Sequence, residues 1–443
     1  MKSKMKQIPF VLLALLLWGG DGAYGQESGA KLWTLRECLD YASEHNIQVK
    51  KSKTAFLSGQ EDTRNAKAKL FPSLAASVSQ SFVNYPSGEA ATGNSYTGSY
   101  GVNAGWTLFD GNRRVNTVRQ QELYDEVNAL GVEQSGNDIR IALIQAYMQA
   151  LYASEAVRIN ENTVEVSEAQ RNRTEELFRA GAVSKADLAQ MESQYSTDRY
   201  GLVASQTNLD NYRLQLKQLL ELDLAEEIRL EIPLLTHSDV TAPLPPKEAV
   251  YAASLAAMPE VRSSELSVDI AQLEIKKARA GYYPSLSLNA GLGTGHASGG
   301  YAFSSQLWDR FNQSVGLSVS IPVYSNRDNK TAVNKAKYAL TSSRLELLNT
   351  RKALLRTVEG VYLDAVSAQN EYLSAAERVR YIEESFKLAE EQFFLGMKNT
   401  LELLTEKNNL LNARQQELQS KYMSVMSRLL LNIYQKKPVD VNW

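Results

Sequence analysis

The stretch YTGSYGVNAGWTLFDGNRR, residues 96–114, carries the pattern that decides the fold. From Tyr96 to Leu108, apolar or aromatic side chains alternate with small polar ones, which is the period of a β-strand with one apolar face. No proline occurs from Ser87 to Ile232, and helix-forming Ala, Leu, Glu, Gln and Arg dominate the part that follows Asn112. The sequence therefore predicts a strand that leads directly into a long helix.

The same pattern occurs twice in the chain. SVGLSVSIPVYSNRDN at 314–329 repeats it, with Gly316 placed 215 positions after Gly101. Upstream, AKAKLFPSL at 66–74 matches ARAGYYPSL at 278–286, and downstream FRAGAVSKADL at 178–188 matches FFLGMKNTLEL at 393–403. We therefore predict two structural repeats, 26–222 and 247–437, joined by an ordered segment at 223–246 and followed by a tail at 438–443.

Each repeat is expected to contain a helix, a β-hairpin and a long helical hairpin. The β-hairpins are predicted at 73–108 and 285–324, and the helical hairpins at 112–222 and 328–436. A helix from Asn112 to Arg179 would be about 100 Å long. Small and apolar residues step by three and four along both long helices, as in Leu143, Ala146 and Ala150, and in Val358 and Ala365. An ordinary antiparallel coiled coil would show the same spacing.

The N-terminus has the composition of a secretory signal peptide, residues 1–25. Lysines precede an apolar stretch from Ile8 to Trp18, and small residues end at Gly25. The apolar stretch is shorter than the roughly 20 residues that a membrane anchor needs. Removing Lys2, Lys4, Lys6 and Asp21 with this segment would change the formal charge from -2 to -4.

The four predicted strands are long enough to cross a bilayer when tilted, because about 9–11 residues suffice. Their second face carries Ser, Thr, Asn and Gly, which suits a watery lumen, although a half-buried sheet in a soluble protein would alternate in the same way. Four strands cannot close a barrel, and an open edge in lipid leaves backbone groups unsatisfied. Two copies of the chain would supply eight strands and three copies twelve; the strand count alone allows both.

The duplication, the strand exits TLFDGNRR and PVYSNRDN and the two F-x-x-G turns together resemble the TolC-like outer membrane efflux proteins, over nearly all of residues 31–437. The resemblance implies a membrane α+β fold, in which a homotrimer forms a 12-stranded β-barrel continued by a long α-helical periplasmic barrel. It implies location in the cell outer membrane of a Gram-negative type of cell, in contact with outer-membrane lipid. The implied function is that of a channel subunit in a tripartite efflux or type I secretion system. The implied partners are a periplasmic adaptor protein and an inner-membrane pump of the RND, ABC or MFS type.

The resemblance also assigns candidate site residues around the two turns. The candidates for adaptor contact are Phe178, Gly181, Asp187, Phe393, Gly396 and Glu402. Glu402 and its counterpart Asp187 are candidates for an acidic pore gate, since three symmetry copies of either would form an anionic ring. The family's second acid, one turn later, is replaced here by Thr405.

Aromatic residues are expected to form two girdles at the membrane surfaces. The candidates for the lipid-facing side and the girdles are Tyr100, Trp106, Phe109, Leu317 and Tyr324. The loops at the outer end add Tyr85, Tyr96, Tyr301, Trp308 and Phe311.

Other functional classes have little support in the sequence. His45, His237 and His296 are scattered, and the chain has neither a metal-binding Cys or His motif nor a phosphate-binding glycine loop. We expect no catalytic site, no metal, no cofactor and no nucleic-acid partner, and Cys38 is predicted to be a buried small side chain. Two other functions remain open at this stage: a periplasmic coiled-coil structural or interaction protein, and an autonomous porin.

Overall fold

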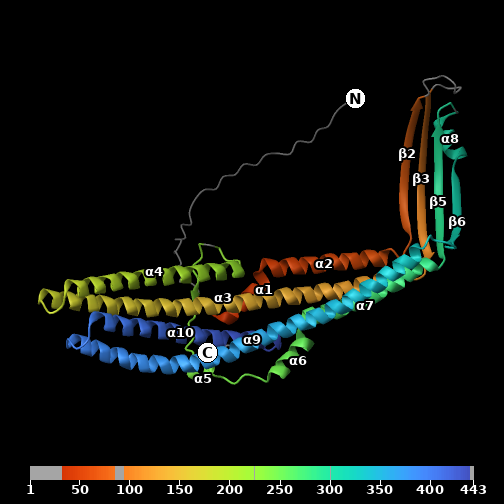
Figure 1. Ribbon diagram of the computed structural model, residues 1–443. Helices are drawn as coiled ribbons and strands as arrows, with labels where there is room; N and C mark the ends of the chain where they lie inside the picture. The colour runs from red at the N-terminus through yellow and green to blue at the C-terminus, as the bar shows by residue number, and fades with distance from the viewer. Residues whose placement is uncertain (1–31, 85–93, 224, 300, 440–443) are drawn as a thin grey trace, which may run out of the picture.

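The computed structural model describes residues 32–84, 94–223, 225–299 and 301–439. It places one four-stranded sheet at one end of four long helices, whose turns lie at the other end (Figure 1). The strands are β2 (Ser73–Asn84), β3 (Asn94–Phe109), β5 (Ser285–Ala297) and β6 (Asn312–Ser320). The long helices are α3 (Arg113–Arg179), α4 (Lys185–Leu220), α9 (Asp328–Phe394) and α10 (Thr400–Tyr434). The predicted signal peptide 1–25 and the loop residue Tyr85 lie outside the described residues.

The sheet is antiparallel, with the order β2-β3-β5-β6. Its register pairs Val78 with Tyr100, Trp106 with Leu288 and Leu288 with Leu317, so the apolar residues of all four strands share one face. Val78 and Leu317 are 73% and 64% exposed in the single chain. Strands β2 and β6 are each paired on one side only, which leaves both outer edges of the sheet open.

The structure corrects two details of the predicted hairpins. The register shifts between Thr107 and Phe109, so Phe109 lies opposite Leu286 and the apolar face continues through Phe109, whereas strict alternation placed Leu108 there. Strand β6 ends at Ser320, although the hairpin 285–324 was predicted to run to Tyr324. Pro322 accounts for this end, because proline has no N–H to donate to a neighbouring strand.

The outer connection of the second hairpin, which was expected to be a loop carrying Tyr301, Trp308 and Phe311, is partly regular. Strand β5 extends to Ala297, and the helix α8 (Phe303–Asp309) follows it. Seven residues are too few for a helical period to stand out, which explains why the sequence did not predict this helix.

Shorter helices line the two longest ones, α3 and α9. Helices α2 (Ile47–Ala68) and α4 pack against α3, and α7 (Pro259–Arg279) and α10 pack against α9. The segment before each hairpin is broken in two, however, because α1 (Leu35–His45) and α6 (Lys247–Ala257) are separate helices. A one-turn 3-10 helix, Ala280–Tyr282, joins α7 to the second β-hairpin.

Local chemistry explains both breaks. Asn46 has an extended backbone, and its Oδ1 accepts a hydrogen bond from Gln48 N, 2.8 Å away, so it ends α1 and caps α2. Met258 precedes Pro259, and a residue before proline is disfavoured in the helical conformation. Among the residues that the structure covers, no helix combines the length and apolarity needed to cross a membrane.

The core lies midway along the helices. The seam residues Leu143, Ala146 and Ala150 are buried, and so is the predicted small side chain of Cys38. In the second repeat Val358 and Ala365 are buried in the same way. The small and apolar residues predicted to line both long helices are therefore buried.

The segment between the repeats is ordered where it is described. It contains β4 (Arg229–Leu230), which pairs in parallel with β1 (Leu32–Trp33), and the one-turn helix α5 (His237–Val240). The Val240 carbonyl accepts a hydrogen bond from Ser424 Oγ at 2.8 Å, and the Ala242 carbonyl accepts one from Gln369 Nε2 at 2.7 Å. The segment therefore packs on α9 and α10 near the middle of the helices (Figure 1).

Candidate functional site at the helical turns

Two glycines reverse the chain at the end of the molecule away from the sheet. Gly181, between α3 and α4, has φ +73°, and Gly396, between α9 and α10, has φ +74°. Both turns have the hydrogen bonds of a Schellman motif: Ala182 N donates to Leu177 O and Met397 N donates to Gln392 O, both at 2.9 Å. The predicted glycine turns are confirmed, and the left-handed backbone explains why glycine occupies both positions.

Each turn is followed by a helix that starts with a capping box. Ser184 Oγ accepts from Asp187 N at 3.2 Å, and Asp187 Oδ2 accepts in return from Ser184 N at 3.1 Å. Asn399 and Glu402 form the equivalent pair, with distances of 2.9 and 3.1 Å. Both acidic gate candidates therefore also act as N-terminal helix caps, a function that the sequence pattern S/N-x-x-D/E already indicates.

Asp187 also connects the two turns. Its Oδ1 accepts a hydrogen bond from Thr400 Oγ1 of α10 at 2.8 Å. The hydroxyls of Ser184 and Thr400 hold the pKa of the Asp187 carboxyl below its usual value, since both stabilise the charged form. Within the described part of the chain, Glu402 makes no equivalent hydrogen bond to the first turn, and its side chain is exposed.

The equivalent phenylalanines of the two turns occupy different environments. Phe178 is 37% exposed, whereas Phe393 is 5% exposed and packs with Met191, Leu403 and Leu404. The burial of Phe393 argues against its predicted role in direct adaptor contact, because its side chain belongs to the small core under the turn. The exposed apolar side chains near it, which the sequence did not single out, are Phe394, Leu395, Met397 and Leu401.

Above the turns, a buried ion pair joins the two repeats. Lys407 Nζ of α10 lies 2.5 Å from Asp198 Oδ2 of α4, and the two side chains are 5% and 4% exposed. Gln194 Nε2 donates to the other oxygen of Asp198 at 2.8 Å. Burial lowers the pKa of Lys407, and Asp198 partly offsets this effect by favouring the charged ammonium.

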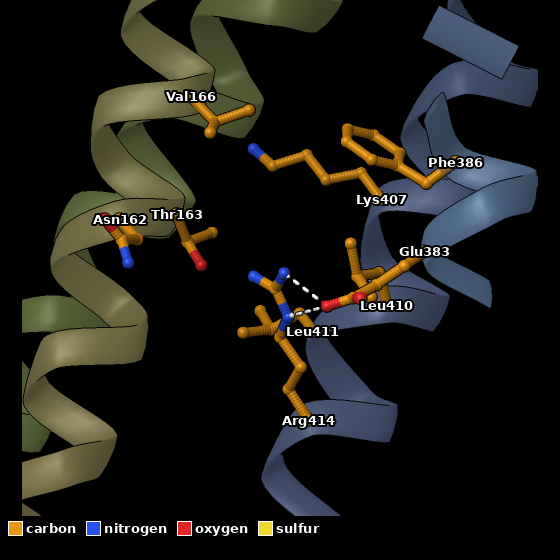
Figure 2. Close-up of a pocket in the computed structure, with 9 residues that line it drawn as sticks. All are labelled: Asn162, Thr163, Val166, Glu383, Phe386, Lys407, Leu410, Leu411 and Arg414. Carbon is orange, nitrogen blue, oxygen red and sulfur yellow. Dashed lines mark hydrogen bonds and ion pairs between the residues drawn. The ribbon is translucent and has the colours of Figure 1, made fainter. Parts of the chain in front are cut away.

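Lys407 also borders a cavity of about 260 Å³ between α3 and the α9–α10 hairpin (Figure 2). Figure 2 shows its side chain extending from α10 toward α3, above the ion pair of Arg414 with Glu383. The sequence pattern of α10 could have indicated that Lys407 is buried. Lys407 falls in the buried series Thr400, Leu403, Lys407 and Leu410, where an apolar residue is expected.

Further polar contacts between the repeats lie on both sides of this pair. Gln170 Nε2 of α3 donates to Glu390 Oε1 of α9 at 3.0 Å, and Tyr422 Oη of α10 donates to Glu155 Oε1 of α3 at 2.7 Å. Together with Thr400–Asp187 and Lys407–Asp198, these four contacts form a series that we call the inter-repeat links. They fix the two helical hairpins to each other from the turns to the middle of the helices.

The lipid-facing candidates lie at the other end of the molecule. Tyr100, Trp106, Phe109 and Leu317 share the apolar face of the sheet by register. Tyr324 follows the end of β6 and is exposed. Trp106 Nε1 donates to the Leu70 carbonyl at 2.9 Å, which fixes this side chain where the strands meet the helices.

Comparison with known proteins places this architecture in a family. The model of the family described as "Outer membrane efflux protein" matches the chain twice, at residues 39–221 and 250–430. Outer membrane protein TolC of Escherichia coli strain K12 is 22% identical over 96% of this chain and 85% of its own length. The probable efflux pump outer membrane protein TtgC of Pseudomonas putida is 24% identical over 80% of this chain and 72% of its own.

A solved structure has the same fold. The outer membrane protein VceC of Vibrio cholerae superposes with a TM-score of 0.77 at 14% sequence identity, covering 92% of this chain and 97% of that one. The structure thus has two repeats, a sheet with open edges and two helical hairpins. The family model matches both repeats. The chain belongs to the outer membrane efflux protein family and is an outer-membrane channel subunit of an export system, with its helices extending into the periplasm.

Proposed function

We propose that three copies of this chain close a 12-stranded barrel and conduct substrate passively from the periplasm to the exterior. The observation that carries the proposal is the sheet itself: β2 and β6 have open edges, and the apolar face is exposed in the single chain. In hydrocarbon each unsatisfied backbone group costs several kcal/mol, so the edges require strands from other copies. Three copies supply twelve strands, which leaves room for a lumen.

The helical turns are the proposed docking end for a periplasmic adaptor, which joins the channel to an inner-membrane pump of the RND, ABC or MFS type. Support comes from the exposed apolar side chains Leu395, Met397 and Leu401, which are unusual at the tip of a helical hairpin. Phe178, Gly181 and Gly396 complete this surface, with Asp187 and Glu402 at its helix starts. The relative TtgC is itself named an efflux pump protein.

Reconstitution tests the function. We expect the purified full-length protein to be a trimer in detergent and to conduct ions in planar bilayers, with low conductance in the absence of an adaptor. A soluble monomer recovered from the periplasm without detergent would instead indicate a coiled-coil interaction protein. High conductance of the purified protein without an adaptor, unaffected by substitution of Leu395 and Met397, would indicate an autonomous porin.

Glu402 is the proposed gate residue, and its substitution by glutamine separates charge from capping. Glutamine at this position retains the capping box, so Glu402→Gln should remove an anionic ring with little effect on the turn. We expect a lower cation preference and about tenfold weaker block by divalent cations, equivalent to ~1.4 kcal/mol. The measurements are the reversal potential in a salt gradient and the concentration of divalent cation that halves the current.

The matched control is Asn399→Ala, which removes the cap of the same helix and keeps the charge of Glu402. It should lower stability by ~1 kcal/mol and leave the ion selectivity unchanged. Equal selectivity in wild type and Glu402→Gln would remove Glu402 from the gate and leave only its capping role.

A further inference from the structure

The short helix α8 lies across the outer end of β5, on the apolar face of the sheet. The register places Thr294 and His296 of β5 opposite Tyr100 and Gly98, so both share the face that carries Tyr100. Thr294 Oγ1 donates to the Leu307 carbonyl, and the ring of Phe303 meets the His296 ring edge-on, with centroids 4.8 Å apart. The helix is thus fixed to the sheet through residues of a single strand, β5.

Helix α8 covers an interruption in the apolar face. On β2 and β3 that face reaches Phe82 and Tyr96, which lie opposite each other near the outer end; it is interrupted on β2 by Gln80, whose Nε2 donates to the Tyr100 hydroxyl at 2.6 Å. On β5 the apolar residues stop at Leu292, and the polar side chains of Thr294 and His296 follow. A polar side chain exposed to hydrocarbon without a hydrogen bond is unfavourable by a few kcal/mol, so β5 alone would be poorly suited to lipid at this level.

The polar groups beneath α8 are hydrogen-bonded and shielded. His296 is 8% exposed and Gln306 is 5% exposed. Gln306 Oε1 accepts from Ala297 N at 2.8 Å, and its Nε2 donates to the Tyr301 carbonyl at 2.7 Å. Helix α8 therefore covers the polar side chains of β5, and its own outer side forms the surface of the molecule there.

That outer side is aromatic and polar together. Trp308 is 80% exposed, next to the exposed hydroxyls of Ser304 and Ser305, and Tyr301 is exposed just before the helix. Trp and Tyr combine an apolar ring with a polar edge, which favours the boundary between lipid headgroups and acyl chains. An aromatic and serine surface suits that boundary better than bulk water or the acyl region.

We propose that α8 lies in the outer headgroup region of the bilayer, with Trp308 as its lipid contact, and completes the membrane-facing surface where β5 becomes polar. The inference rests on the proposed barrel. A lipid surface is the occupant that the structure favours, because α8 continues the apolar face of the sheet.

Nitroxide labels at three positions test this proposal in the full-length protein, reconstituted in phosphatidylcholine vesicles. The variants are Trp308→Cys on α8, Leu317→Cys on the apolar face of β6 and Ser318→Cys on its opposite face. Cys38 is fully buried, so labelling under native conditions should be confined to the new cysteine. The measurement is the relative accessibility of each label to oxygen, which concentrates in lipid, and to a water-soluble nickel chelate.

We expect the ratio of oxygen to nickel accessibility to be highest at 317, lowest at 318 and intermediate at 308. A ratio at 308 equal to that at 318 would place α8 in water, and low accessibility to both reagents would show that protein covers it; either result overturns the proposal. A label at 317 that behaves like the label at 318 would contradict the barrel itself. Adding Gln306→Ala should increase label mobility at 308 and leave 317 unchanged, whereas equal mobility at 308 would overturn the fixed position of α8.

Discussion

Replacing Lys407 by methionine should lower the free energy of unfolding by ~3–5 kcal/mol. The change leaves the Asp198 carboxylate buried without its ammonium partner, and such unpaired buried charges are strongly destabilising. Asp198 would keep its hydrogen bond from Gln194, which is neutral and cannot replace the lost charge. The measurement is urea unfolding of the detergent-solubilised protein, followed by the far-ultraviolet circular dichroism of its helices.

A double variant and an exposed pair supply the controls. Asp198→Leu combined with Lys407→Met should recover most of the loss, because apolar replacement of both partners is often neutral or stabilising. Arg173→Met, which breaks the exposed pair of Arg173 with Glu176, should cost less than about 1 kcal/mol. If Lys407→Met cost no more than Arg173→Met, the buried pair would have no special role in stability.

The pH dependence of stability tests whether burial of the charged groups causes these losses. In Asp198→Asn, Lys407 lacks its partner, and burial lowers its pKa in the folded state below the value of about 10.5 expected in the unfolded state. The unfolded state then binds more protons between the two values, so the stability of this variant should rise with pH across that range.

The second large effect is expected at the sheet. Leu317→Arg should prevent recovery of trimers from the membrane, because an arginine that faces lipid near the middle of a bilayer costs ~2–4 kcal/mol. Every copy in the proposed trimer would carry this cost. The measurement is the yield of detergent-extracted trimer at equal expression.

Ser318→Arg is the matched control, since it is the next residue of the same strand and faces the other side of the sheet. There the guanidinium would lie in the proposed watery lumen, and assembly should be normal. Equal loss in both variants would mean that arginine disrupts β6 regardless of its face, and normal trimers in both would contradict the proposed lipid-facing side.

The sequence predicted the features that repeat or that have a regular period. The long helices, the glycine turns and the strand faces all follow from spacing that continues over many residues, and burial of Leu143 and Val358 agrees with it. Local exceptions were missed: the shifted register at Phe109, the end of β6 before Pro322 and the seven-residue helix α8. Each depends on one residue or one turn, which is too little for a periodic pattern to reveal.

The candidate site was predicted less completely, for a related reason. Alignment of the repeats located Gly181 and Gly396, since both require the same backbone conformation. It also treated Phe178 and Phe393 as equivalent, and their environments differ because Phe393 packs in a core with Met191, Leu403 and Leu404, whereas Phe178 is 37% exposed. The link between Lys407 and Asp198 joins residues 209 positions apart, so spacing along one helix could indicate the buried lysine but not its partner.

The difference between Phe178 and Phe393 has a consequence for symmetry. In the proposed trimer the six turns would alternate between two chemical surfaces: the first turn of each copy presents Phe178, and the second presents Phe394, Leu395 and Met397 above a filled core. A partner that recognises either surface would find three places to bind, and a partner that fits both would find six unequal ones. In the proposed trimer, the duplication of the chain would therefore give a ring whose backbone turns repeat every sixth of a turn and whose surface chemistry repeats every third.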